Sequence, residues 1–309
     1  MEPALESILV VLDPAAGEQP VIDKACRVAA GSGARLRLFC CGHDPRLTAR
    51  LMLSPDALSA ARAEFLRGRR AWLESLAEPL RASGLEVEVE AAWDSPLHAG
   101  VLTEVGLARP GLVMKDAAWQ EPVMRRLFSH ADWRILQSCP VPVLLTRQSA
   151  WASPPRLAAA VDPGHPGDPD AVLDHAILAL GLRVARWIGA DPAVVHACLP
   201  VDRALLPAAA GGLPLVPPGG AIGDDMRQAA RDAVAELLRG HDYPAASAHI
   251  IEGAAIDVLP AWCAEAGVDV LVVGVTSRSR IAEAMIGSTA ERLLDRVPSD
   301  LLVVHGPVH

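Results

Sequence analysis

The chain is built from two copies of one pattern, and this internal repeat limits its fold more than any other feature. The apolar run 7–12 leads into Asp13-Pro14, and the run 156–161 leads into Asp162-Pro163 in the second half. A repeat of this size indicates a duplicated domain and not a solenoid unit. A length of 309 residues suits two cores of about 150 residues each. We therefore expect a first domain at 1–147 and a second at 156–309, joined by a short linker that contains proline.

Within each half, short aliphatic runs alternate with longer segments of helical period. The expected strands are 7–12, 35–40, 86–92, 112–115 and 142–146 in the first half, and 157–161, 193–198, 246–251, 269–274 and 300–304 in the second. Helices are expected over 58–80 and 222–238, the second of them stopped by Gly240. Strands that are apolar throughout and separated by helices favour a parallel sheet covered on both faces. The predicted fold class is α/β, with two tandem doubly wound five-stranded parallel-sheet domains.

Composition excludes several classes of function. The net charge of −9 argues against a nucleic-acid partner, which needs a concentrated basic face. No run of about 18 apolar residues is present to span a bilayer, so no membrane partner is expected. The six cysteines form no C-x-x-C pair, which favours reduced thiols and a cytoplasmic location. The histidines show no H-E-x-x-H pattern, so we expect no metal site, and we interpret His196 as a locally bonded residue.

The carboxyl-terminal forty residues contain the strongest candidate for a binding site. An apolar strand ends at Val273 and Gly274 and runs into a loop of small residues that includes Ser277. Gly287, Ser288 and Thr289 then open a helix. Small loop residues let a ligand approach the backbone, and the unpaired N–H groups of a helix start suit an anion. This pattern predicts a phosphate site.

These residues resemble the universal stress protein family, in particular its tandem, E-type members. Nucleotide-binding members carry a loop of Gly, two residues, Gly, nine residues and Gly-Ser/Thr after strand four. Gly274 matches the first glycine, Ser277 stands at the second, and Gly287-Ser288 follow at the expected spacing, with Thr289 continuing the pattern. The family also has an Asp after strand one, which Asp162 matches.

The resemblance implies a fold and a ligand. The fold is that of adenine nucleotide alpha hydrolase-like proteins, with strand order 3-2-1-4-5, in which the winding direction reverses between strands one and four. The ligand is ATP, or ADP or AMP, bound in the second domain. Ala160, Ala197 and Val273 would line the site beside Asp162 and Gly274. The expected role is a stress-response sensor or regulatory binding module and not an enzyme, with slow ATP hydrolysis as the upper limit. Magnesium beside the phosphates is left open.

Structural explanations compete with this interpretation. Ser288-x-x-Glu291 is also a capping box, and Asp162-Pro163 is also ordinary turn chemistry. The alternative function is a tandem stress protein that binds no nucleotide and instead holds an apolar small molecule or acts through protein contacts. The replacement of glycine by Ser277 motivates that alternative.

The first half lacks the phosphate loop. Its fourth strand ends at Lys115, and Ser129-His130 stand where the second half has Gly287-Ser288. Asp132 then falls in the first turn of a helix, where its charge would repel a phosphate. Large side chains are available to fill the cleft, namely Trp119, Phe128 and Trp133. We therefore interpret the first half as a degenerate domain.

The resemblance also implies how the halves assemble. In the family, the fifth strands of two such domains pair across a dimer axis. Strands 142–146 and 300–304 should therefore pair within one chain and form an intramolecular pseudo-dimer. A further homodimer of the tandem chain is left open.

Overall fold

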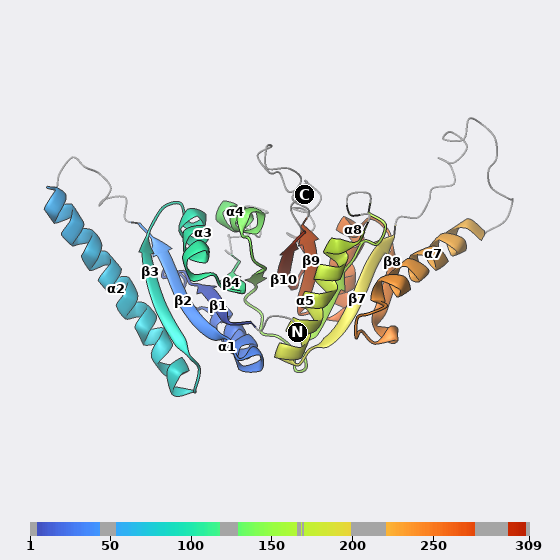
Figure 1. The fold of residues 1–309 in the computed structure, drawn as a ribbon, viewed down its shortest axis with the longest axis horizontal. Coiled ribbons are helices and arrows are strands. Elements are labelled where there is room, and N and C mark those ends of the chain that lie inside the picture. Colours follow the sequence, from blue (N-terminus) through green and yellow to red (C-terminus); the bar gives the residue numbers. More distant parts are fainter. Residues whose placement is uncertain are drawn as a thin grey trace, which may run out of the picture. The chain divides into compact units, whose positions relative to one another are not determined.

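The computed structural model describes residues 5–43, 54–117, 129–165, 168, 170–198, 221–275 and 296–306. The chain divides into two compact units. Unit 1 comprises Met1–Pro155, Arg186–Ala190 and Asp300–His305, and unit 2 comprises Arg156–Ala185, Asp191–Ser299 and Gly306–His309. Both units have the α/β architecture, and Figure 1 shows their elements.

Unit 1 contains a mostly parallel sheet. Its strands are β1 (Ser7–Val11), β2 (Arg35–Gly42), β3 (Val87–Trp93), β4 (Leu112–Asp116), β5 (Val143–Thr146) and β10 (Asp300–His305). Strands β3, β2, β1, β4 and β5 lie in that order and are parallel. β1 buries all five of its residues, as expected for the centre of a sheet that is covered on both faces.

The helices of unit 1 begin and end at residues typical of those positions. They are α1 (Pro20–Ser32), α2 (Pro55–Ala82), α3 (Leu97–Ala108) and α4 (His130–Ser138). α1 has proline in its first turn and ends at Gly33, which adopts the left-handed conformation with φ of 75°. Gly31, two residues earlier, packs against the backbone of Trp187. A β-carbon at position 31 would lie 1.8 Å from the Trp187 carbonyl oxygen, so only glycine fits there.

β10 joins the sheet of unit 1 although it comes from the far end of the chain. It pairs antiparallel with β5, with Leu301 opposite Leu145 and Val303 opposite Val143. The expected pairing of strands 142–146 and 300–304 is therefore confirmed. The predicted domain boundaries, 1–147 and 156–309, stay a prediction. The compact units differ from them, because Arg186–Ala190 and β10 are assigned to unit 1.

Unit 2 repeats the same winding. Its strands are β6 (Arg156–Ala160), β7 (Asp191–Cys198), β8 (Ala248–Glu252) and β9 (Val270–Val275). Its helices are α5 (Val172–Ile188), α7 (Ala221–Leu238) and α8 (Ala255–Ala266), with a 3-10 turn, η2, at Ala245–Ser247. β6 pairs parallel with β7 and β9, and β7 pairs parallel with β8, so the order is β8-β7-β6-β9.

The expected strands and helices are confirmed in kind and position. Each of the ten predicted strands overlaps an observed strand, and the two predicted helices correspond to α2 and α7. Gly240, the predicted stop after 222–238, has φ of 95° just beyond the end of α7. The fold class is therefore α/β and doubly wound, as the alternation of aliphatic runs and helical periods predicted.

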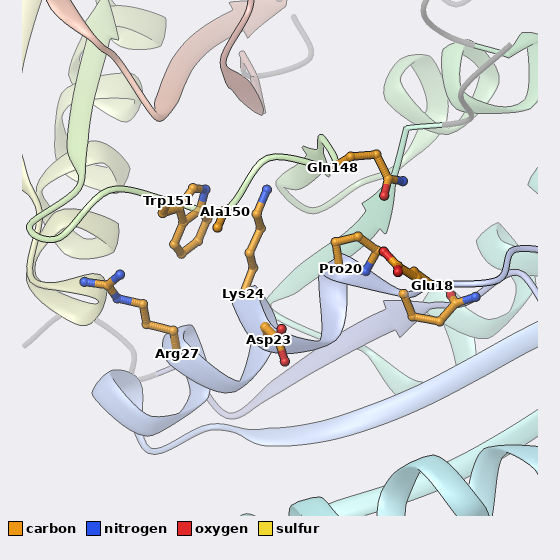
Figure 2. Close-up of a pocket in the computed structure, with 9 residues that line it drawn as sticks. Glu18, Pro20, Asp23, Lys24, Arg27, Gln148, Ala150 and Trp151 are labelled. Carbon is orange, nitrogen blue, oxygen red and sulfur yellow. The ribbon is translucent and has the colours of Figure 1, made fainter. Parts of the chain in front are cut away.

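A buried ion pair anchors the start of β10 in unit 1. The Lys24 ammonium lies 2.7 Å from a carboxylate oxygen of Asp300, and the two side chains are 5% and 2% exposed. Lys24 also donates to the Arg147 carbonyl at 2.8 Å. The carboxylate of Asp300 accepts two further bonds, from the Arg147 N–H and the Trp151 indole N–H, each at 2.7 Å. Figure 2 shows Lys24 and Trp151 approaching each other from α1 and from the segment after β5. Burial raises the pKa of Asp300, and Lys24 opposes that rise.

Removing the cation alone should destabilise the protein strongly. Lys24→Met leaves the buried carboxylate of Asp300 without its counter-charge, so we expect the free energy of unfolding to fall by about 3–5 kcal/mol. The double variant Lys24→Met/Asp300→Asn removes both charges and should recover part of that loss. Urea unfolding of the full chain measures both effects.

Arg67→Met provides the matched control, because Arg67 pairs with Glu64 on the exposed surface of α2. Its cost should stay below about 1 kcal/mol. A Lys24→Met cost no larger than that of Arg67→Met would contradict the anchoring role of the buried pair.

Candidate functional site

The carboxyl edge of the unit 2 sheet has the topology of a binding site. The chain passes from β6 to β7 and β8 on one side, then returns to β9 on the other side of β6. In open α/β sheets, ligands bind beyond the carboxyl ends of the strands where the winding direction reverses. That point lies between β6, followed by Asp162, and β9, which contains Gly274. The expectation that strands one and four flank this point is confirmed.

Three of the predicted site residues lie on one face of this edge. Ala160 is in register with Val195, and Ala158 is in register with Leu271. Because partners in a parallel pair share a face and side chains alternate along a strand, Ala160, Ala197 and Val273 face the same side. Ala160 and Ala197 are partly exposed, whereas Val273 is buried. The structure therefore brings a small, partly open apolar surface to the end of the sheet.

Asp162 presents its carboxylate to solvent at this edge. The side chain is 65% exposed, and the Nδ1 atom of His196 lies 3.9 Å from one of its oxygens. The backbone of Asp162 is held in place, because its N–H donates to Asp174 at 3.0 Å and its carbonyl accepts from the His165 N–H at 3.1 Å. A fixed backbone with an exposed carboxylate is suited to accept hydrogen bonds from a ligand.

His196 is a neighbour of this site that sequence reasoning assigned only to local bonding. Its Nδ1 lies 3.0 Å from the Val161 carbonyl oxygen, which can only accept, so Nδ1 carries the proton. The predicted local bond is confirmed. His196 and Asp162 lie close together in space because β7 pairs with β6. Only the strand register reveals this proximity.

Asp174 is a second carboxylate at the same turn, and it is buried. Burial raises the pKa of Asp174, and the nearby charges of Asp162 and Asp168 raise it further, while the Asp162 N–H and His196 act in the opposite direction. Asp168 itself accepts from the N–H groups of Val172 and Leu173, and so caps the start of α5. Sequence analysis missed Asp174, since nothing in its spacing distinguishes it from a surface residue of a helix.

Gly274 has a packing role that the sequence did not reveal. A β-carbon at this position would lie 2.6 Å from Cγ of Leu173 and 2.8 Å from Cδ1 of Ile177. Both side chains belong to α5, so the absent side chain of Gly274 makes room for that helix. The predicted approach of a ligand to its backbone remains a prediction. The other predicted residues of the loop, Ser277, Gly287, Ser288 and Thr289, lie outside the described residues.

The corresponding edge of unit 1 is occupied by the protein's own carboxylates. Asp132 lies in the first turn of α4, as predicted, and forms a capping box with Ser129. Its carboxylate is fully buried and lies 2.8 Å from the Lys115 ammonium. This carboxylate takes the position at the helix start that an anionic ligand would need. Trp133 beside it is buried, as expected, whereas Trp119 and Phe128 lie outside the described residues.

A second carboxylate at this edge of unit 1 is also bonded within the protein. Asp116 at the end of β4 accepts from the Thr146 hydroxyl at 2.7 Å and from the Val21 N–H, in the first turn of α1, at 3.3 Å. Burial raises its pKa, while these two bonds and the nearby lysines lower it. Asp13, the counterpart of Asp162, accepts from the Ala15 N–H at 2.9 Å in a local turn. The two halves therefore share a framework but differ at the edge where ligands bind.

Three other observations concern the described residues. A cavity of about 550 Å³ beside α1 is lined by Lys24, Arg27 and Trp151, among others (Figure 2). The Lys24 ammonium is already bonded to Asp300 and Arg147, so this cavity offers no free buried cation. Within the described residues, no cluster of three or more His, Cys, Asp or Glu side chains could hold a metal ion. Among the described helices, none is both long and apolar enough to cross a bilayer.

Comparison with known proteins agrees with this geometry. Residues 156–305 match the universal stress protein family. The chain is 24% identical to universal stress protein E of Photorhabdus laumondii over 303 residues, covering 97% of this chain and 94% of that protein. It is also 24% identical to universal stress protein E of Escherichia coli K12 over 299 residues, covering 97% and 93%. The second half of the chain therefore belongs to the universal stress protein family.

Solved structures share this fold over the whole chain. A protein of unknown function from Pseudomonas aeruginosa PAO1 is 25% identical, with a TM-score of 0.73. The match covers 98% of this chain and 93% of that one. A universal stress protein from Archaeoglobus fulgidus is 13% identical, with a TM-score of 0.64 and coverage of 97% and 98%. The resemblance stated from the sequence to this family is confirmed.

The packing of Gly274 against α5 can be tested directly. Gly274→Ala places a methyl group against Leu173 and Ile177, and we expect the free energy of unfolding to fall by about 1–3 kcal/mol. Leu173→Ala in the same chain should recover part of this loss, because it removes the side chain that the methyl group meets. Urea unfolding of the three variants checks the coupling. Additive losses in the double variant would show that the two positions do not meet.

The pKa of Asp174 should leave a signature in the pH dependence of stability. Because the folded state raises this pKa above the usual value of about 4, the folded protein holds the proton more tightly than the unfolded chain does. The stabilising contribution is therefore complete below about pH 4 and is lost as the pH rises through the raised pKa. Asp174→Asn keeps an acceptor for the Asp162 N–H and removes the charge.

We expect the stability of Asp174→Asn, relative to the natural protein, to increase as the pH rises from about 4 and then level off. Urea unfolding between acid and neutral pH measures this difference. Asp170→Asn, on the exposed surface, is the control and should show a flat difference. A difference for Asp174→Asn that does not change with pH would contradict the assignment.

Proposed function

We propose that the second half of this chain binds ATP or a related adenine nucleotide and acts as a sensor or regulatory binding module. The observation that supports this proposal most is the exposed carboxylate of Asp162 at the reversal point of the unit 2 sheet, beside the small residues Ala160 and Ala197. In this fold class the reversal point is where ligands bind. The family motif around Gly274 and Ser288 in the sequence adds the phosphate-binding part of the proposal.

Each part of a nucleotide has a proposed partner. The carboxylate of Asp162 accepts from the ribose hydroxyls or the adenine amino group. Ala160, Ala197 and Val273 offer apolar surface to the base. The N–H groups and hydroxyls of Ser288 and Thr289 are proposed to hold the phosphates. Magnesium, where it accompanies the phosphates, would be held mainly by their oxygens and by water.

The proposal assigns one nucleotide to each chain. In unit 1, Asp132 and Asp116 already place carboxylates at the starts of α4 and α1. A phosphate there would find the helix N–H groups already occupied by these carboxylates. The function is therefore binding and sensing by the second half, and no catalytic residue is proposed.

Isothermal titration of the full chain with ATP, with and without magnesium, tests this proposal. We expect one site per chain. Asp162→Asn should weaken binding about tenfold or more, because a hydrogen bond to a charged group is worth about 1.5–3 kcal/mol. Asp13→Asn is the matched control, since Asp13 is the repeat counterpart of Asp162 in the first half, and it should leave the affinity unchanged.

Two outcomes would remove the proposal. The first is the absence of both heat and a thermal shift at millimolar nucleotide. The second is binding that Asp13→Asn weakens and Asp162→Asn does not, which would place the site in the first half.

A further inference from the structure

β8 is an edge strand of the unit 2 sheet. It pairs with β7 on one side, and within the described residues no strand pairs with its other side. The backbone groups on that side therefore lack ladder partners. Such an edge is a template for another extended chain unless side chains, charges or a covering element block it.

A cavity of about 630 Å³ lies along this edge. Four consecutive residues of β8, Ala248 to Ile251, line it. Since successive side chains of a strand point to opposite faces, the cavity wraps the edge of the sheet and does not lie on one face. Val234 and Leu238 of α7, which lies beside β8 in Figure 1, line it too.

The other side of the cavity is aromatic. Trp262 of α8 lines it, and its ring lies 5.2 Å from that of His249 on β8. His249 is in register with Val195, on the face opposite α5, whereas Ile250 is on the α5 face. An extended chain in the cavity would therefore direct alternate side chains toward the aliphatic residues of α7 and toward Trp262.

The equivalent edge strand in unit 1 is protected along its length, whereas β8 carries an ion pair only at its last residue. β3 carries Glu88 and Glu90, which pair with Arg37 and Arg70. In addition, the Arg81 side chain donates to the Val87 carbonyl at 2.8 Å. Charged residues and bonded edge carbonyls are devices that prevent strand addition. Ala248, Ile250 and Ile251 carry no charge, and the one acidic residue of β8, Glu252 at its end, pairs with Arg227 of α7. In the part of the chain that the structure describes, no side chain bonds to the backbone of β8.

The rim of the cavity is basic. Arg231 and Arg239 of α7 line it and are exposed. Arg239 pairs with Glu236, whereas Arg231 forms no ion pair within the described residues. In a chain of net charge −9, this local positive charge selects for an acidic group on the occupant.

We propose that β8 accepts an extended peptide segment of a partner protein as an added strand. The segment has apolar side chains in alternation and an acidic residue that meets Arg231. An acyl chain would fill the apolar walls but could not satisfy the edge N–H and C=O groups, which only another backbone pairs in register.

Fluorescence anisotropy with a labelled synthetic peptide on the full chain tests this inference. The probe has about eight residues, with valine and threonine in alternation and glutamate at both ends. We expect saturable binding. Two further peptides carry N-methyl groups on every second backbone amide, one on the odd positions and one on the even positions. One of these peptides should lose binding and the other should keep it, because only one set of amides faces β8.

Variants of the cavity provide the second readout. Ala235 is an exposed lining residue, so Ala235→Phe should fill the cavity and block binding, while the matched variant Ala235→Ser should bind normally. Arg231→Glu should weaken binding about fivefold at low ionic strength. Arg134→Glu, an exposed residue of α4, should have no effect.

Three results would overturn the inference. The first is that the peptide does not bind. The second is that both methylated peptides bind as well as the unmodified one. The third is that decanoate binds in place of the peptide and Ala235→Phe blocks it. The methylation patterns use the natural protein, so they decide the question even where a variant fails to fold.

Discussion

The buried pair of Lys24 and Asp300 is the interaction on which the arrangement of unit 1 depends most. Two charges that are almost fully removed from water are tolerable only when each has a counter-charge and further hydrogen bonds. Here Arg147 and Trp151 complete the set from the segment that follows β5. The first residue of β10 is thus bonded to α1 and to the chain that leads toward β6, which places β10 beside β5.

The two halves share one sheet topology but differ in the carboxylates at its carboxyl edge. Both have a central first strand whose neighbours lie on either side, so both have a point where the winding reverses. In unit 1, Asp132 and Lys115 neutralise each other there, and Asp116 is bonded to Thr146. In unit 2, the carboxylate of Asp162 is exposed. The two copies therefore share the sheet and differ in the carboxylates at its carboxyl edge.

The outer strands of the two sheets differ in the same way. β3 carries Glu88 and Glu90 and its edge is bonded to an arginine of α2, whereas the acidic residue of β8, Glu252, lies at the end of the strand. The rest of β8 borders a cavity between α7 and Trp262. A protected edge keeps a sheet monomeric, and an open one invites a partner. Both proposed binding events, of a nucleotide and of a partner strand, therefore fall in the second half.

The sequence by itself determined the local structure and the family. Aliphatic runs and helical periods act over short distances, so they predicted every described strand, and the repeat located Asp162 and Asp132 by their place after a strand and at a helix start. Tertiary structure alone decided which distant residues meet. Lys24 and Asp300 come together, as do Gly274 and Leu173, and Asp174 joins Asp162, because strand register and helix packing set these contacts. No sequence pattern reports the burial that shifts the pKa of Asp174 or the space that makes Gly274 necessary, since both depend on neighbours brought in by the fold.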